Sequence, residues 1–216
     1  MNDGRFASQE LLRDMKNNAD FGDSVIGPEL RKQTKVLNLG CGFVKIENAV
    51  NVDKIAMCDP DILWDIDIMP WPFDDNSFDV IYMDHVLEHL INWWGALREA
   101  SRVLRVGGDL LVFVPDQTNS HAMAYRDHLH VFTIASFQNF SDGSCSRTGT
   151  NAYVKDEIVT NGTIPLIIKY YRRVPFPKYA WMQKWPWLLK FCANHMINFI
   201  DEQHVGFRKI QTEDRK

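Results

Sequence analysis

The amino-acid sequence predicts an α/β fold built on a mostly parallel, twisted sheet, and three observations lead to this prediction. Residues 35–39 form an apolar run with the length and composition of a buried strand. Gly40 and Gly42 follow that run at once, and a glycine pair lets the backbone turn sharply and approach a ligand closely. Further strand-like runs then alternate with loops and a helical segment, an order that is typical of parallel sheets.

The segments on either side of this glycine turn complete the first part of the fold. Residues 7–19 are expected to form a short amphipathic helix that either packs on the sheet or covers the ligand site. After the turn, only residues 43–47 have room for helix, which is little more than one turn. The apolar run at 49–52 then predicts the second strand, which ends on the acid Asp53.

The next elements are marked by prolines and turn residues. A third strand is expected at residues 61–65, and it ends at the Met-Pro-Trp-Pro run of 69–72 because proline cannot continue a central strand. A turn at 74–76 leads into the fourth strand at 78–83. Residues 85–90, directly after it, predict one helical turn.

The best-defined helix in the sequence covers residues 93–104. The glycines at 107–108 are expected to end it, and a fifth strand follows at 109–114. The helix has a core-facing stripe of apolar residues at helical spacing: Trp93, Leu97, Ala100 and Leu104.

The remainder of the chain is less regular. Residues 163–172 are prone to form a strand, and residues 205–210 are the candidate for the last strand. Between them lies an aromatic block, residues 176–200, for which we expect a role as core, substrate wall or homodimer contact. A membrane-surface or lipid-substrate role is the alternative, which the small number of lysines in the block does not favour.

Length and composition place the chain among ordinary globular enzymes. The 216 residues are 45% hydrophobic and 24% charged, which suits one domain with a sizeable core. A net charge of −4 gives no support for a nucleic-acid partner. Four cysteines without metal-type spacing, no secretory signal and no run long enough to span a membrane predict a reduced, cytoplasmic setting.

The stretch at residues 35–53 indicates an adenosine-type ligand. In nucleotide-binding α/β folds, an acid at the end of the second strand accepts hydrogen bonds from ribose hydroxyls, and Asp53 stands at that place. Val44 and Lys45 occupy the place of a third fingerprint glycine, and Asp53 comes earlier than the roughly 20 residues of a dinucleotide fingerprint. The stretch therefore argues against a dinucleotide, and an ordinary strand-to-loop turn remains the alternative.

Four segments in order resemble class I S-adenosylmethionine-dependent methyltransferases, in particular the small type 11-like family. The segments are LNLGCG, NVD, WDIDIMPWPFDDNSFDVIYMDHVLEHL and REASRVLRVGGDLLVFVPD. The resemblance covers residues 35–116, and residues 117–140 more loosely. It implies a Rossmann-like sheet with helices on both faces, a C-terminal cap, an antiparallel last strand, and S-adenosylmethionine as the cofactor.

The resemblance also divides the chain. Residues 1–34 are expected to form an N-terminal helix and lead-in, and residues 35–140 the S-adenosylmethionine-binding methyltransferase core. Residues 141–216 become a loop, the aromatic cap and the final strands of the same domain.

The donor site follows from the resemblance position by position. The glycine loop lies against the methionine and ribose parts of the donor, Asp53 binds the ribose, and Asp65 binds the adenine amino group. Asn38 stands where the wider fold usually has an acid. The alternative is that Asp53 and Asp65 are only turn residues at strand ends. The implied donor-binding residues are Asn38, Gly40, Cys41, Gly42, Asp53, Lys54, Asp65, Ile66 and Met83.

Polar residues directly after the fourth strand are the candidate catalytic group, because ligands of open α/β sheets bind at the carboxyl ends of the strands. A histidine titrates near neutrality, so His85 is predicted to be the general base, with Asp84 beside it. If this turn is helical from residue 85, His85 and His89 lie one turn apart with Glu88 beside them. That spacing also suits a metal, but we predict none, and packing or capping is the alternative role for Glu88 and His89.

A second polar cluster follows the fifth strand. Asp127, His128 and His130 resemble the D-P-x-H-x-x-x-F-T pattern of such methyltransferases, with His128 in place of the proline. His130 is therefore a second candidate catalytic residue. Its alternative role is a hydrogen bond to a loop backbone.

The resulting prediction is methyl transfer to an oxygen or nitrogen of a small molecule or saccharide. No basic surface for nucleic acid is evident in the sequence. The alternative is a non-catalytic adenosyl-ligand-binding module that acts as a subunit or scaffold. An oxidoreductase of the nicotinamide type is disfavoured by the incomplete fingerprint.

Overall fold

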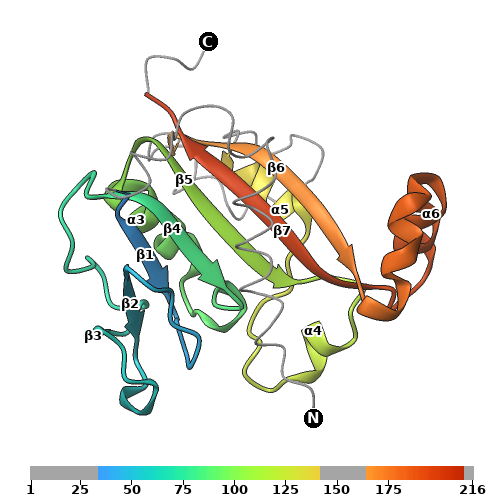
Figure 1. The fold of residues 1–216 in the computed structure, drawn as a ribbon, viewed down its shortest axis with the longest axis horizontal. Helices are drawn as coiled ribbons and strands as arrows, with labels where there is room; N and C mark the ends of the chain where they lie inside the picture. Colours follow the sequence, from blue (N-terminus) through green and yellow to red (C-terminus); the bar gives the residue numbers. More distant parts are fainter. Residues whose placement is uncertain (1–33, 142–163, 212–216) are drawn as a thin grey trace, which may run out of the picture. The chain divides into compact units, whose positions relative to one another are not determined.

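The computed structural model describes residues 34–141 and 164–211. The described residues from Val36 onward form one compact unit, and Figure 1 shows its central sheet. The predicted helix at 7–19 lies outside the described residues.

The sheet contains seven strands in the order β3-β2-β1-β4-β5-β7-β6. The first five strands pair in parallel, and β7 runs antiparallel to both of its neighbours, β5 and β6. The predicted α/β fold, the mostly parallel sheet and the antiparallel last strand are therefore confirmed, although β7 lies inside the sheet and β6 forms the edge. The strands are β1 (Val36–Leu39), β2 (Ala49–Asp53), β3 (Ile62–Leu63), β4 (Phe78–Asp84), β5 (Leu104–Pro115), β6 (Leu166–Pro175) and β7 (Ile200–Lys209).

Two of the described helices, α3 and α5, pack against the same face of the sheet (Figure 1). The rings of Trp94 on α3 and Phe140 on α5 meet edge to face at 4.7 Å, and both join the core formed with Ile81, Val112 and Val205 of the strands. The helical elements are η2 (Ala56–Cys58), η3 (Leu87–His89), α3 (Trp93–Val103), α4 (His121–Ala124), α5 (Ile134–Ser141), η5 (Pro177–Lys184) and α6 (Pro186–His195).

The end of α3 differs from the prediction. The helix ends at Val103, and Leu104 already begins β5, so the glycines at 107–108 do not end it. They lie in β5 where its pairing with β4 is irregular. Gly108 is needed there because a Cβ would come 2.7 Å from the carbonyl oxygen of Asp79. The glycines that were expected to end the helix are therefore explained, at Gly108, by the close packing of β5 against β4.

The connection between β1 and β2 contains turns and no helix over residues 40–48, all of which are described. Buried side chains hold this short connection. The Nδ2 atom of Asn38 donates to Oδ1 of Asn51 (2.9 Å) and to the carbonyl of Val44 (3.2 Å), and Asn51 Nδ2 donates to Asp61 (2.8 Å). Through Asn38 and Asn51, β1 and β2 are thus tied to each other and to the helix-free connection between them.

The aromatic block forms a small core of its own around η5 and α6. The predicted core role is confirmed for part of it, since Met182, Phe199 and Ile200 are buried together. Trp187 and other aromatic side chains of the block stay exposed. The substrate-wall and homodimer roles stay predictions.

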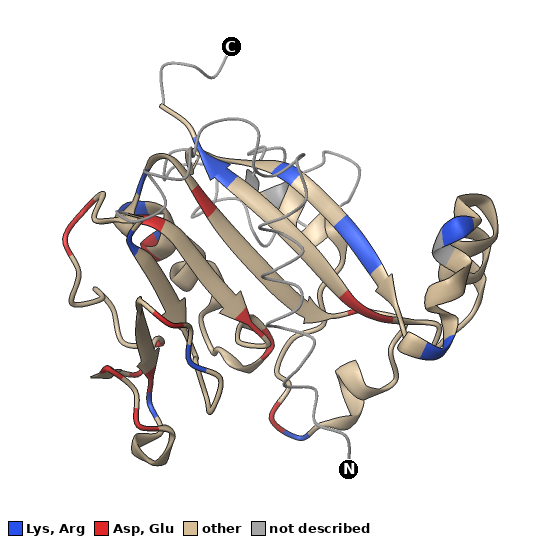
Figure 2. Cartoon of the chain, in the orientation of Figure 1, with Lys and Arg blue, Asp and Glu red and all other residues tan. Residues whose placement is uncertain are grey.

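None of the helices in the described ranges has the length and apolarity needed to cross a membrane. Figure 2 shows acids at the carboxyl ends of β2 and β4 and at the start of β7, the region where the ends of the parallel strands meet.

Candidate active site

The carboxyl ends of β1, β2 and β4 carry the predicted donor site. β1 lies between β2 and β4 in the sheet, so the glycine turn after β1 is flanked by Asp53 at the end of β2 and by Asp84 at the end of β4. Ligands of open parallel sheets bind at such an edge. The topology thus brings together the residues that the sequence indicated.

The two glycines of the turn both have positive φ angles, +66° at Gly40 and +49° at Gly42, but their surroundings differ. A Cβ at Gly40 would come 2.4 Å from Cγ2 of Val86, so the residue after β4 packs directly under the turn. A Cβ at Gly42 would meet no atom of the described residues within 4 Å. Gly40 is required by packing, whereas Gly42 borders space that no described residue fills within 4 Å.

We therefore expect Gly40→Ala to lower the free energy of unfolding more than Gly42→Ala. Both variants carry the left-handed strain of about 1–2 kcal/mol, and Gly40→Ala adds an overpacking cost of about 1–3 kcal/mol against Val86. Urea denaturation of the two variants measures the difference. Equal losses would show that Val86 moves aside, and the double variant Gly40→Ala/Val86→Ala is expected to regain part of the loss.

Asp53 is buried, with 7% of its surface exposed, and its carboxylate holds the turn. Oδ2 accepts the amide hydrogen of Gly42 (2.8 Å), and Oδ1 accepts that of Ile55 (2.9 Å). An ionised carboxylate has about four acceptor positions, so two remain for ribose hydroxyls. The turn role that the sequence left open is therefore present, and ribose binding by Asp53 stays a prediction.

Asn38 has a structural contact that the sequence did not indicate. Both of its described hydrogen bonds run to the β1–β2 connection, through Asn51 and Val44. Hydrogen bonds from the backbone and side chain of Asn51 in turn hold the pKa of Asp61 below its usual value. The signal for Asn51 was the polar residue inside the apolar run AVNVD, which is costly to bury unless it is hydrogen-bonded.

The remaining predicted donor residues divide into surface and core. Asp65 keeps 35% of its side chain exposed, accepts the amide hydrogen of Asp67 (3.1 Å) and lies 3.9 Å from Nζ of Lys54. Ile66 and Met83 are buried in the hydrophobic core. Asp65 and Lys54 are thus available to a ligand through their side chains, and Ile66 and Met83 only through their backbone.

Cys41, between the two glycines, is a buried neutral thiol. Burial, with the nearby charge of Asp53, raises the pKa of Cys41 to about 11. Its amide donates to the carbonyl of Val52 (3.0 Å), which ties the turn to β2. Its place in the donor site is therefore defined by its backbone.

Two carboxylates flank His85, and its role as a general base stays a prediction. It has a positive φ of 53°, lies before η3 and is not on the helix with His89. Nδ1 faces Oε1 of Glu88 (3.1 Å), and Nε2 faces Oε2 of Glu202 (3.2 Å). Burial lowers the pKa of His85, but these two hydrogen bonds outweigh it and raise the pKa well above its usual value. Both ring nitrogens are thus engaged by carboxylates, which favours the protonated ring, while 46% of the side chain stays exposed.

Asp84 ends β4 beside His85 and is partly exposed. Burial raises the pKa of the Asp84 carboxyl above its ordinary value, against the opposing effect of the His85 cation. Oδ2 accepts a hydrogen bond from the hydroxyl of Tyr82 (3.2 Å). The catalytic role of Asp84 stays a prediction.

His130 makes the backbone contact that the sequence kept open as an alternative. Its Nε2 lies 2.9 Å from the carbonyl oxygen of Leu90, to which it donates. The ring also packs near Trp93 and Phe132. This environment anchors the loop after α4 to the start of α3, and a catalytic role of His130 stays a prediction.

Comparison with known proteins adds family information to this geometry. Residues 47–112 match the family described as Methyltransferase domain. The chain is 39% identical over 64 residues to a protein of Amycolatopsis mediterranei named 27-O-demethylrifamycin SV methyltransferase. That alignment covers 28% of this chain and 24% of the relative, so the chain spans about a quarter of the relative's length.

Two solved structures are similar over nearly the whole chain. One is a SAM-dependent methyltransferase from Archaeoglobus fulgidus, with a TM-score of 0.54, 12% identity, and coverage of 96% of this chain and 100% of that one. The other is the [4+2]-cyclase SpnF, with a TM-score of 0.56, 15% identity, and coverage of 97% and 85%. At such low identity these likenesses show a shared fold.

Proposed function

The chain has the fold of class I S-adenosylmethionine-dependent methyltransferases and a methyltransferase-domain match over residues 47–112, and on this premise we propose that it transfers a methyl group from S-adenosylmethionine. The by-product is S-adenosylhomocysteine. The observation that carries the proposal is the carboxylate of Asp53, which fixes the amide of Gly42 at the open side of the glycine turn.

The connection between β1 and β2 favours an adenosyl ligand over a dinucleotide. A dinucleotide pyrophosphate is held at the N-terminus of the helix after the first strand. Residues 40–48 are described throughout and contain only turns, so this chain has no helix N-terminus at that place. An adenosyl sulfonium carries no phosphate and does not need one.

We expect the protein to bind S-adenosylmethionine and S-adenosylhomocysteine in preference to NAD. Isothermal titration calorimetry with the three ligands measures this preference directly. Tight NAD binding without heat from either adenosyl ligand would contradict the proposed donor.

The acceptor is proposed to be an oxygen or nitrogen of a small molecule or saccharide. The net charge of −4 does not favour a nucleic acid. The relative from Amycolatopsis mediterranei is named for a small-molecule substrate, and another relative is named a sterol 4-C-methyltransferase. A transfer assay with labelled donor and a panel of hydroxyl and amine acceptors tests this choice.

Asp84 is proposed as the proton acceptor in place of His85. It stands at the end of β4, next to the strand that carries the glycine turn, and burial makes its carboxylate more basic than usual. In the transfer assay, Asp84→Asn should keep donor affinity and lose turnover, because a positioned base contributes roughly 10²–10⁴-fold. Full turnover of this variant on a confirmed acceptor would contradict this role and would indicate that the protein only positions the donor and the acceptor.

The second candidate is an adenosyl-binding module without transferase activity. The carboxylates of Glu88 and Glu202 on either side of His85 favour it, because they already engage both nitrogens of this predicted base. The likeness to a cyclase also illustrates that the fold by itself does not determine the reaction. Donor binding without turnover on any acceptor of the panel distinguishes this candidate from the transferase.

We also retain two further proposals about the protein's setting. The free cysteines Cys41, Cys58 and Cys192 support a reducing, cytoplasmic location. The exposed aromatic side chains of the 176–200 block support a homodimer contact.

A further inference from the structure

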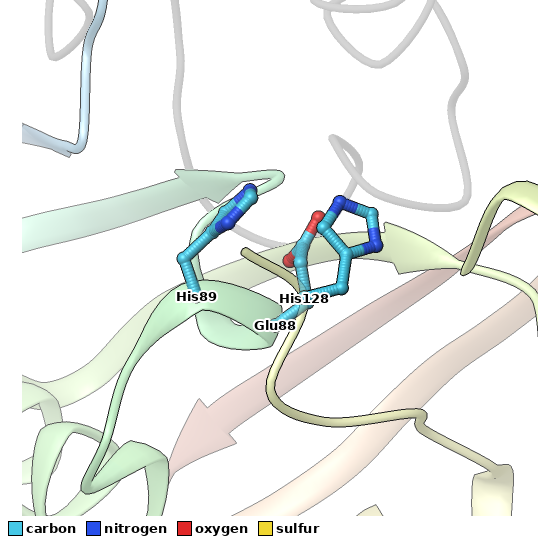
Figure 3. A group of neighbouring side chains, drawn as sticks. All are labelled: Glu88, His89 and His128. Atoms are coloured by element: carbon cyan, nitrogen blue, oxygen red, sulfur yellow. The ribbon is translucent and has the colours of Figure 1, made fainter. Parts of the chain in front are cut away.

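Three side chains with metal-binding atoms meet beside η3. Glu88 and His89 come from η3 and His128 from the loop after α4, as Figure 3 shows. One ligand-type atom of each lies within 4.8 Å of the others. The imidazole rings of His89 and His128 stand nearly perpendicular, with centroids 4.7 Å apart. The sequence paired His89 with His85, whereas the fold pairs it with His128.

The hydrogen bonds of both histidines fix their tautomers. Nδ1 of His89 lies 3.0 Å from the carbonyl oxygen of Asp127, and Nδ1 of His128 lies 3.1 Å from that of Ala122. A carbonyl only accepts, so each Nδ1 carries the proton and each Nε2 keeps a lone pair. Histidines that bind metals usually have their second nitrogen hydrogen-bonded in this way.

Glu88 supplies a buried carboxylate oxygen that has no other role. Only 1% of the residue is exposed, and Oε2 has no hydrogen-bond partner within the described part of the chain. The other oxygen, Oε1, is held by Nδ1 of His85 (3.1 Å). A buried, unpaired carboxylate oxygen is costly, so it indicates a missing positive partner.

The two segments that carry these residues are fixed to each other. The carbonyl oxygen of Glu88 accepts the amide hydrogens of Leu129 (2.7 Å) and His130 (3.3 Å). The backbone therefore holds His128 next to η3. Preorganised ligands on a tied pair of segments are what a stable metal site requires.

A second group of potential ligands lacks these properties. Atoms of Asp84, His85 and Glu202 also converge. Both nitrogens of His85 face carboxylate oxygens there, so the ring acts as the positive partner itself and leaves no lone pair for a metal.

We propose that Glu88, His89 and His128 bind a divalent first-row transition-metal ion, with Zn²⁺ as the reference ion. Two imidazole nitrogens and one carboxylate oxygen form a ligand set that such ions take up, and three protein ligands leave a coordination position open for water or another oxygen ligand. His85 does not bind the ion itself, but its hydrogen bond to Oε1 of Glu88 orients the carboxylate that does. The site goes beyond the proposed methyl transfer and does not depend on it.

The test uses the full chain without a polyhistidine tag, stripped with a chelator and titrated with Zn²⁺ in competition with a chromophoric chelator. The wild type is expected to bind one Zn²⁺ per chain. Loss of an outer-layer partner typically costs 10–100-fold in affinity, so Glu88→Gln, His89→Ala and His128→Ala should each cost about 100-fold or more. Co²⁺ serves as a spectroscopic probe, and its visible absorption should disappear when Zn²⁺ is added.

The matched control is His195→Ala. His195 is an exposed histidine on α6 outside the cluster, with Nδ1 on the carbonyl of Phe191 (2.8 Å). This variant should keep the wild-type affinity and stoichiometry. Circular dichroism checks the fold of every variant, and His128→Asn, in a loop and only half-buried, decides the question if Glu88→Gln does not fold. Wild-type stoichiometry below one, or equal Zn²⁺ affinity in wild type and folded cluster variants, would overturn the site.

Discussion

Asp116→Ala is expected to lower the free energy of unfolding by about 3–5 kcal/mol, the range found when one partner of a buried ion pair is removed. Asp116 directly follows β5 and is fully buried. Its two carboxylate oxygens accept from Nε and Nη2 of Arg173 on β6, each at 2.8 Å. Without the carboxylate, the guanidinium is left in a site where only 18% of the Arg173 side chain is exposed.

The carboxylate of Asp116 also organises the chain beyond this ion pair. Oδ1 accepts the amide hydrogen and the hydroxyl hydrogen of Thr118, at 2.8 and 2.6 Å. The substitution therefore removes four hydrogen bonds and connects the C-terminal end of β5 less firmly to β6. Urea denaturation, with the midpoint and the slope fitted separately, measures the loss.

Asp109→Ala is the matched control, because Asp109 also accepts two hydrogen bonds from an arginine across the sheet. Arg208 donates to it through Nε (2.8 Å) and Nη2 (2.9 Å). Both partners keep about a quarter of their surface, at 26% and 24%, so we expect a loss of only about 1 kcal/mol. The double variant Asp116→Ala/Arg173→Met should recover much of the first loss, since no charge then stays unpaired. Equal losses in the two single variants would show that burial does not set the cost.

The sequence was sufficient where the signal is local. Gly40, Gly42 and Asp53 lie within one short stretch, and the positive φ angles and the strand end follow directly from residue type. The apolar runs likewise predicted the strands, because a parallel sheet buries both faces and needs continuous apolar segments. The antiparallel direction of the last strand was expected only from the resemblance, and the order of the strands was not predicted.

The sequence was insufficient where a role depends on a partner far along the chain. His85 was expected to be a base, and no sequence signal links it to Glu202 on β7, whose Oε2 lies 3.2 Å from its Nε2. His128 was read as a substitute for a proline, and its contact with His89 depends on the path of the loop after α4. Long-range pairing of polar side chains is a tertiary property that residue spacing does not encode.

Asp53→Ala is expected to weaken donor binding by at least tenfold. A hydrogen bond to a charged acceptor contributes about 1.5–3 kcal/mol, and 1.4 kcal/mol corresponds to a factor of ten in affinity. Loss of one hydrogen bond to the ribose therefore suffices for this effect. The substitution also removes the acceptor of the Gly42 and Ile55 amides, so the turn is held less firmly and binding weakens further. Calorimetry with S-adenosylhomocysteine measures the affinity. Asp59→Asn is the control, because the Asp59 side chain is 97% exposed. Its carboxylate forms a surface ion pair with Nζ of Lys45, at 3.1 Å.

Two roles of Asp53, ribose acceptor and holder of the turn, predict different results with a 2′-deoxyribose analogue of the same ligand. If Asp53 binds the ribose hydroxyl, the wild type loses affinity for the analogue, and Asp53→Ala binds both ligands equally weakly. If Asp53 only holds the turn, the analogue costs the same in both proteins, because the hydroxyl then interacts elsewhere. The two perturbations form a cycle whose coupling energy isolates the ribose contact from the loss of the turn. We expect a coupling close to the full cost of removing the hydroxyl, since two acceptor positions of the carboxylate remain after the Gly42 and Ile55 amides are bound.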